Sequence, residues 1–346
     1  MMYLEFNRIG RLIAGLSLCI ICLAGCSKTE QNKEQILPSD LKQLYPQQLT
    51  KFDKVDSLYF SFLGINAFLA EDNNIILAVW DPAMLLKTDF EGNTIIAKTV
   101  TGKGPGETLG IGVPAIDTDG NIYVLDQWQS KIVKYDKNLQ LQGERVVKTE
   151  EGLQTFQIYP TFNNGQLLVE LGRPTLSNID DLRKVMSIYD FNTGVFGDTI
   201  ETFSRPYSPI GSMSGGQAGS GIQVPFSDEQ LITYKPESKT FLFFDTRTNI
   251  IAEIDSKFDT LRVITVNLPQ EKVSQEELEA FRLQDDRLDG QNWERVKART
   301  PKLKAKADIM HYYKEEIWLK SNLKSEYDKW LVLDMNGEIK HAGSVI

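Results

Sequence analysis

Residues 120–140 read GNIYVLDQWQSKIVKYDKNLQ: a short apolar strand, a polar turn, a second strand that ends in Tyr135-Asp136, and a further turn. Similar stretches recur along the chain, at 73–93, at 165–175 continued by 184–194, at 229–249 and at 315–338. The equivalent residues Ile76, Ile122 and Leu167 are 46 and 45 residues apart. A repeat of this length, with four short strands in each unit, is typical of β-propeller blades.

With 120–140 as the template, the second repeat predicts strands at 112–117, 121–126, 131–136 and 139–147. Asp/Asn/Gly turns such as DTDGN (117–121) join them, as expected between antiparallel strands. The spacing predicts an all-β fold: a six-bladed β-propeller of four-stranded antiparallel blades over residues 50–346. Five or seven blades remain alternatives, because the division into blades between 200 and 270 is open.

Residues 270–308 interrupt the repeat. Ser274 and Glu277 form an S-x-x-E capping box ahead of a segment with helical propensity. We therefore expect a mostly helical insertion before the last blade. Several basic residues follow within 293–308, and we interpret them as a solvated face, with a docking surface for an anionic partner as the alternative.

The amino-terminal end is predicted to be a lipoprotein signal peptide, residues 1–25. An apolar run of 14 residues, Leu12–Gly25, follows two arginines and is too short to cross a bilayer. It leads into Leu-Ala-Gly-Cys at 23–26, which resembles the bacterial lipobox, so Cys26 is the predicted lipidation site and membrane anchor. An ordinary secretory signal is the alternative. Residues 26–49 are polar and are expected to form the lipidated N-terminus and a tether.

The composition excludes several kinds of chemistry. The three cysteines, Cys19, Cys22 and Cys26, lie in the signal and at the anchor, so the mature chain would offer no thiol for catalysis or zinc. The formal charge of −9 argues against nucleic acid as a partner. The two histidines, His311 and His341, have no partner at metal-ligand spacing. We predict neither a metal site nor another cofactor.

The stretch GKGPGE at 102–107, followed by DTDGN at 117–121, gives the chain a family resemblance. Together with the lipobox and the repeat, it resembles the envelope lipoproteins of the six-bladed, TolB-like or NHL-like β-propeller class that are abundant in Bacteroides. The resemblance implies the fold and a place in the cell envelope, with the outer membrane favoured because no aspartate follows Cys26. It implies no activity, and so no catalytic residues.

GKGPGE is not a phosphate-binding loop, since the lysine is misplaced and no helix is expected after it. We interpret it as the connector between the first two blades. In a four-stranded meander such connectors share one end with the turns between second and third strands, and binding function concentrates in such loops. The candidate ligand-binding residues at that end are Trp80, Asp81, Lys103, Glu107, Asp126, Trp128, Arg173, Arg205, Tyr207, Lys235 and Lys320.

Two functions remain open at this point. The first is a binding or protein-interaction module whose partner is a glycan, a peptide or an envelope protein. The second is a hydrolase-like, lactonase-like or lyase-like enzyme that uses pore carboxylates such as Asp81 and Asp126, with or without a divalent cation. The absence of a catalytic signature favours the binding module.

Overall fold

The structure is a computed structural model, and it describes residues 42–43, 54–55, 58–59, 65–70, 74–80, 82–149, 153–159, 165–172, 183–203, 207–210, 220–325 and 328–345. The chain divides into two compact units, Met1–Lys33 and Glu34–Ile346, and every described residue belongs to the second. The predicted signal peptide, Cys26 and nearly all of the tether lie outside the described residues.

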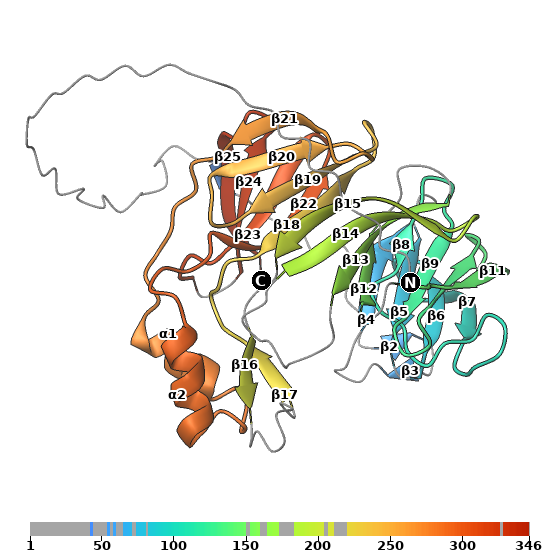
Figure 1. Cartoon of the computed structure of the whole chain (residues 1–346), viewed down its shortest axis with the longest axis horizontal. Coiled ribbons are helices and arrows are strands. Elements are labelled where there is room, and N and C mark those ends of the chain that lie inside the picture. Colours follow the sequence, from blue (N-terminus) through green and yellow to red (C-terminus); the bar gives the residue numbers. More distant parts are fainter. Residues whose placement is uncertain are drawn as a thin grey trace, which may run out of the picture. The chain divides into compact units, whose positions relative to one another are not determined.

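The second unit is an all-β propeller built from four-stranded antiparallel blades (Figure 1). Every blade is a simple meander, in which strands that follow one another in the chain are hydrogen-bonded neighbours. The first three blades are β4 (Ile65–Leu69), β5 (Ile75–Val79), β6 (Met84–Thr88) and β7 (Thr94–Thr99); β8 (Ala115–Ile116), β9 (Ile122–Asp126), β10 (Lys131–Tyr135) and β11 (Leu141–Val146); and β12 (Gln154–Tyr159), β13 (Gln166–Gly172), β14 (Arg183–Asp190) and β15 (Val195–Phe203).

Two further blades complete the set among the described residues. They are β18 (Gln230–Lys235), β19 (Thr240–Asp245), β20 (Ile250–Ile254) and β21 (Thr260–Thr265); and β22 (Ala307–Tyr313), β23 (Glu316–Ser321), β24 (Asp328–Asp334) and β25 (Ile339–Val345). The short strand β1 (Lys42–Gln43) adds to the last blade, parallel to β25. Another short pair, β2 (Lys54–Val55) and β3 (Leu58–Tyr59), forms a separate hairpin.

The expected six blades are therefore wrong for the described part of the chain, which forms five. The stretches 229–235, 240–245 and 250–254 prove to be successive strands of one blade. Between β15 and β18 the described residues form only a hairpin, β16 (Tyr207–Ile210) with β17 (Ser220–Gln223). The sequence gives the reason: SMSGGQAGSG (212–221) lacks the alternating apolar residues that a blade must bury.

The insertion before the last blade holds two short helices, α1 (Gln275–Arg282) and α2 (Gly290–Arg299). They cover less than half of residues 270–308, so the expectation of a mostly helical segment is wrong. The capping box is confirmed: the Ser274 amide donates to Glu277 Oε2 at 2.9 Å, and the Glu277 amide donates to Ser274 Oγ at 3.2 Å.

Lys304 departs from the predicted solvated face, whereas Lys297 and Lys302 are exposed. The side chain of Lys304 is only 2% exposed, and its ammonium group pairs with Glu271 at 3.1 Å and with Glu277 at 2.5 Å. Lys304 therefore holds the start of α1 against the segment that enters the last blade. Because it is buried, Lys304 is not part of a solvated face. Without these two carboxylates, burial of its ammonium group would be strongly destabilising.

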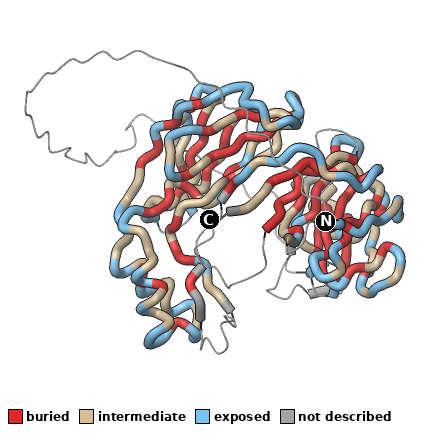
Figure 2. Tube along the Cα trace, in the orientation of Figure 1, coloured by how far each residue is buried: buried red, intermediate tan, exposed pale blue. Residues whose placement is uncertain are grey.

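The cores lie between consecutive blades. Middle strands such as β6 and β9 are buried along their whole length, whereas the outer strands β7 and β11 contain only partly or fully exposed residues (Figure 2). Four apolar clusters join β4–β7 to β8–β11, β8–β11 to β12–β15, β12–β15 to β18–β21, and β18–β21 to β22–β25. Among the described residues, no helix has the length and apolarity required to cross a bilayer.

Candidate functional site

The predicted connector between the first two blades is confirmed, since residues 102–107 lie between β7 and β8. Gly102 has φ +146°, and a Cβ there would come 2.0 Å from Glu107 Oε2. The Glu107 carboxylate fills that space and accepts the Gly104 amide at 2.7 Å. Glycine is favoured at position 102 because its φ of +146° lies in a region that other residues rarely adopt.

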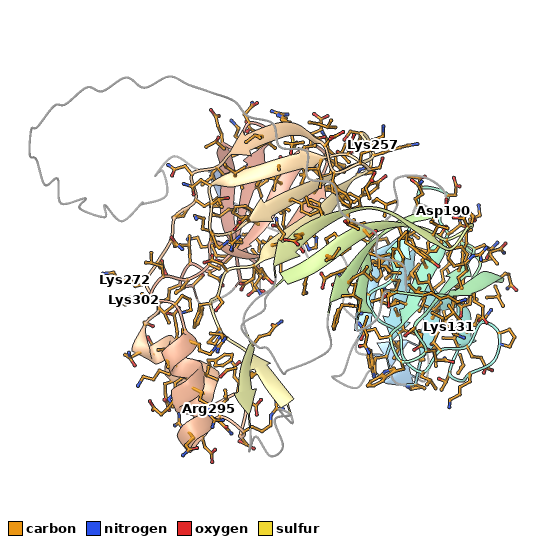
Figure 3. The ribbon with its side chains drawn as sticks, in the orientation of Figure 1. Lys131, Asp190, Lys257, Lys272, Arg295 and Lys302 are labelled. Carbon is orange, nitrogen blue, oxygen red and sulfur yellow. The ribbon has the colours of Figure 1, made fainter. Side chains whose placement is uncertain are left out.

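Residues of the second blade form hydrogen bonds with the connector. The Tyr135 hydroxyl donates to the Gly106 carbonyl at 2.5 Å, and the Gly106 amide donates to Glu144 at 2.8 Å. Lys131, labelled in Figure 3, is 4% exposed and donates to the Gly104 carbonyl at 3.3 Å and to Glu144 at 3.2 Å. The connector is therefore a fixed structure and not a loose linker.

The turn between β9 and β10 lies against the same connector, at the end where the sequence places it. Asp126 joins the two: its Oδ2 accepts the Leu109 amide at 2.7 Å, and its Oδ1 accepts the Trp128 and Gln129 amides at 2.9 and 3.0 Å. The Gln129 side chain adds a bond to the Gly102 carbonyl at 3.1 Å. Asp126 is completely buried, so its carboxylate organises the turn and does not face a ligand.

Two tryptophans, Trp80 and Trp128, lie next to Gly110 on the segment that follows the connector. A Cβ on Gly110 would lie 3.4 Å from Cζ2 of Trp80 and 3.5 Å from Nε1 of Trp128, so both indoles flank the same glycine. Trp80 is 37% exposed and Trp128 is 69% exposed. Leu109 and Val113, on the same segment, are also exposed. We call Trp80, Leu109, Val113 and Trp128 the connector surface.

The other predicted site residues are distributed more widely. Lys103 is exposed on the connector itself, and Glu107 is half-buried in it. Lys320 lies on β23, next to the loop that joins the second and third strands of the last blade, and pairs with Asp328 at 2.9 Å. Asp81, Arg173 and Arg205 lie outside the described residues. Tyr207 belongs to β16, but the structure does not describe its side chain.

The prediction that Lys235 lies at the same end of the blades as the connectors is wrong. Lys235 ends β18, which is the first strand of its blade, so the turn after it joins first to second strands. In an antiparallel meander that turn lies at the opposite end from the connectors. The sequence-based placement took β18 for a second strand. Lys235 instead pairs with Glu253 at 3.3 Å.

A cavity of about 760 Å³ was missed by the sequence analysis. We call it the inner-strand cavity, because the first strands β8, β12, β18 and β22 or the residues next to them supply much of its wall. Its polar and aromatic lining includes Asp117, Gln157, Tyr159, Glu170, Lys184, Thr202, Glu229, Tyr234, Asp308, His311 and Tyr312. One signal was present: a tyrosine stands at or next to the end of three of these strands, at 159, 234 and 312.

The cavity groups are linked by defined contacts. Glu170 pairs with Lys184 and accepts the Tyr159 hydroxyl at 3.3 Å. Burial raises the pKa of Tyr159 well above its usual range and the pKa values of Tyr234 and Tyr312 to about 12. Burial lowers the pKa of His311, whose ring stacks on Trp330. At neutral pH the cavity therefore presents neutral phenols and a neutral imidazole.

Comparison with known proteins adds fold-level likenesses. No family model and no curated protein sequence matches the chain. Among solved structures, it is similar to a member of the DUF4221 family from Bacteroides vulgatus, with 10% identity, a TM-score of 0.47, and coverage of 84% of this chain and 83% of that one. It is also similar to a putative exported protein from Bacteroides fragilis, with 13% identity, a TM-score of 0.41, and coverage of 91% and 78%.

A third similar structure is the Dos1 propeller, with 9% identity and a TM-score of 0.39 over 78% of this chain. The chain spans only 54% of the length of that protein. At these levels of identity the comparisons concern the fold alone. The chain is a β-propeller by its own four-stranded blades, and proteins of Bacteroides are among its structural neighbours.

Proposed function

We propose that the protein is a non-catalytic binding module of the cell envelope, and that its connector surface binds an apolar segment of a peptide or protein partner. The observation that carries the proposal is the pair of exposed indoles of Trp80 and Trp128 on either side of Gly110. Exposed apolar patches of this kind mark interaction sites, and tryptophan is among the residues enriched at their energetic centres.

The connector surface is ordered before any partner binds. Asp126 accepts three backbone amides from the connector and the turn, and Tyr135 and Lys131 bind connector carbonyls from below. A partner would not have to order this loop, so little of the interaction energy would be lost to conformational entropy.

The nearby polar groups favour a peptide over a glycan. A sugar needs hydrogen-bonding side chains directed at its hydroxyls, but the two described carboxylates of this region bind groups within the connector and the adjoining turn, and Lys103 is the exposed charged side chain of the connector. Both oxygens of Asp126 bind the turn, and Glu107 binds the Gly104 amide. What remains on the outside is mostly apolar: Trp80, Leu109, Val113 and Trp128.

The same contacts weigh against the enzyme alternative at this end of the blades. Asp126, one of the two carboxylates that alternative requires, is buried and bonded to backbone amides. A general acid or base must reach the substrate proton it transfers. The position of Asp81, the other carboxylate, is outside the described residues.

The proposed function includes a lipid anchor at Cys26. The LAGC tetrad at 23–26 and the polar segment after it support a lipid on Cys26 and a tether of about 24 residues. Stable attachment requires more than one acyl chain, which a bacterial lipoprotein cysteine carries. The propeller would then present its connector surface to partners at the outer membrane.

A peptide selection tests the proposed function. The mature protein is used to select from a displayed peptide library, and the affinity of the best peptides is measured by calorimetry for the wild type, Trp128→Ala and Tyr313→Ala. Tyr313 is the matched control, since its ring is 54% exposed but lies at the first-to-second-strand turn of the last blade. We expect Trp128→Ala to weaken binding by about 2 kcal/mol, roughly thirtyfold, and Tyr313→Ala to change it little.

Two results would contradict the proposal. The first is a set of selected peptides that bind Trp128→Ala as tightly as the wild type. The second is a glycan array in which an oligosaccharide binds in a Trp128-dependent way while no peptide does, which would leave the surface in place and change its ligand class.

A further inference from the structure

We propose that the inner-strand cavity is a second, separate site, and that it binds an uncharged sugar. The proposal does not rest on the proposed function, because no residue of the connector surface is among the described residues that line the cavity. The feature that carries it is a row of polar side chains that crosses one face of the third blade and lines the cavity. These residues, which we call the polar row, are Gln157, Glu170, Lys184 and Thr202.

The polar row takes one residue from each strand of the blade, β12, β13, β14 and β15. Gln157 is opposite Glu170 on the neighbouring strand, and Lys184 is opposite Thr202. The ion pair between Lys184 and Glu170 joins the two halves of the row. The side chains thus follow one another across the whole blade, so a single ligand can contact several of them.

The rest of this face is apolar. Leu168 and Met186 lie two residues from Glu170 and Lys184 on the same strands, so they share the face of the polar row, and they pack into the core against β18–β21. Glu170 and Thr202 are nevertheless only 8% and 9% exposed. Burying polar groups costs free energy unless they are hydrogen-bonded. Packing alone would favour apolar side chains at these positions, so the polar row points to a bound ligand.

The charged groups of the lining disfavour an ionic ligand, because each has a partner. Asp117 accepts the Asn121 amide of its own turn, and Glu170 pairs with Lys184. Asp308 accepts the side-chain amide of Asn322 at 2.8 Å, and Glu229 also has a partner. An ion entering the cavity would lose its hydration without meeting an unpaired counter-charge. An uncharged polar molecule has no such cost.

The uncharged polar side chains of the lining can bind hydroxyl groups. Among the described residues, the Thr202 hydroxyl and the side-chain amides of Gln157 and Gln230 have no hydrogen-bond partner. A hydroxyl can donate and accept, and an amide offers donors and an acceptor. Lys184 uses one of its N–H donors on Glu170, and others are available to a ligand. Neighbouring hydroxyls of a sugar, each both donor and acceptor, match this set.

The size of the cavity suits a sugar. Its volume of about 760 Å³ falls within the roughly 300–1,000 Å³ of typical ligand sites. The rings of Tyr159, Tyr234 and Tyr312 pack against the cores between blades, so recognition depends on hydrogen bonds and not on stacking. Ile309, which is 37% exposed and lines the cavity, offers an apolar contact to the C–H groups of the ring.

The test uses matched pairs of probes on the mature protein. Glucose, galactose and mannose are each compared with the corresponding uronate, glucuronate, galacturonate or mannuronate, by saturation-transfer difference NMR. We expect saturable binding of at least one neutral sugar. Its uronate should bind more weakly by about tenfold or more, because the added carboxylate would be buried where Lys184 is already paired.

A matched pair of substitutions tests the polar row. Thr202→Val replaces the hydroxyl by a methyl group of similar size and should weaken binding of the neutral sugar by about fivefold to tenfold. Thr199→Val is the control, since Thr199 is exposed on the opposite face of the same strand, opposite Ser187. It should bind like the wild type. Unchanged far-UV circular dichroism shows that each variant is folded.

The outcomes separate this proposal from the proposed function. Trp128→Ala should bind the sugar like the wild type even where it loses a selected peptide, and a failed peptide selection would leave sugar binding unaffected. Sugar binding that depends on Trp128 would overturn the assignment to the cavity. No saturable binding of any of the neutral sugars, a uronate that binds as tightly as its neutral sugar, or equal effects of Thr202→Val and Thr199→Val would each overturn it.

Discussion

Asp126→Ala should destabilise the protein more than any other single substitution in the connector or in the turn between β9 and β10. The substitution removes the acceptor of the Leu109, Trp128 and Gln129 amides, which lie 2.7, 2.9 and 3.0 Å from the carboxylate. A buried donor left without an acceptor costs about 1–3 kcal/mol. The Trp128 and Gln129 amides can recover some hydration when the turn opens, so we expect a total loss of about 3 kcal/mol.

The matched control is Asp136→Ala. Asp136 occupies the same kind of turn one strand later, where its Oδ1 accepts the Asn138 and Gln140 amides at 2.8 and 2.9 Å. Those bonds are exposed, so water can replace the carboxylate and the expected loss is about 1 kcal/mol. Urea unfolding followed by far-UV circular dichroism measures both. If Asp126→Ala costs no more than Asp136→Ala, Asp126 does not hold the connector as argued.

Three further predictions concern other parts of the chain. Gly337→Ala should cost more than about 2 kcal/mol in urea unfolding, because Gly337 has φ +86° and a Cβ there would lie 2.2 Å from the Thr265 carbonyl oxygen. Gly290→Ala should cost about 1 kcal/mol or less, since nothing lies within 4 Å of its added Cβ; equal losses would refute the clash. Stability should fall as pH rises above 10, because burial raises the pKa of Tyr234 to about 12 whereas an unfolded tyrosine ionises near 10. Absorbance at 295 nm should then show incomplete tyrosine ionisation at pH 11 until urea is added, and complete ionisation of the folded protein would contradict this. Cys26→Ser should move the protein from the membrane fraction to the soluble fraction and remove the lipid mass of the mature chain; a membrane-bound variant would show a different anchor.

The repeat of the second blade could be predicted closely because local signals agree there. NIYVLD and KIVKYD become β9 and β10, and the Asp-Gly turn before β9 forms as expected. Asp117 accepts the Asn121 amide at 2.8 Å, which is a local contact that the sequence specifies directly. Where strand pattern and turn residues indicate the same structure, a single sequence is sufficient.

The position of the connector, with Trp80 and Trp128 near it, was predictable for a related reason, whereas Leu109 and Val113 were not predicted. Antiparallel meanders alternate their turns between two ends, so the strand order alone brings the connector next to the turn at 126–130. The role of Asp126 was not predictable, because an exposed ligand and a buried turn acceptor have the same residue type. Lys235 was misplaced for the same lack of information: its blade was recognised, but β18 was counted as the second strand.

The inner-strand cavity could not be predicted, because its residues are distant in the chain and, apart from Asp117 of DTDGN, belong to no motif. Part of its wall also comes from beyond the first strands: Glu170 from β13, Lys184 from β14 and Thr202 from β15. These three side chains cross one face of the third blade, the blade after which the repeat fails. In the described part of the chain, the next residues form the hairpin β16–β17 in place of a fourth consecutive meander. This face also packs against β18–β21 through Leu168, Met186 and Ile188. The incorrect blade count has a separate cause, since residues 212–221 lack the alternating apolar residues that another blade would bury.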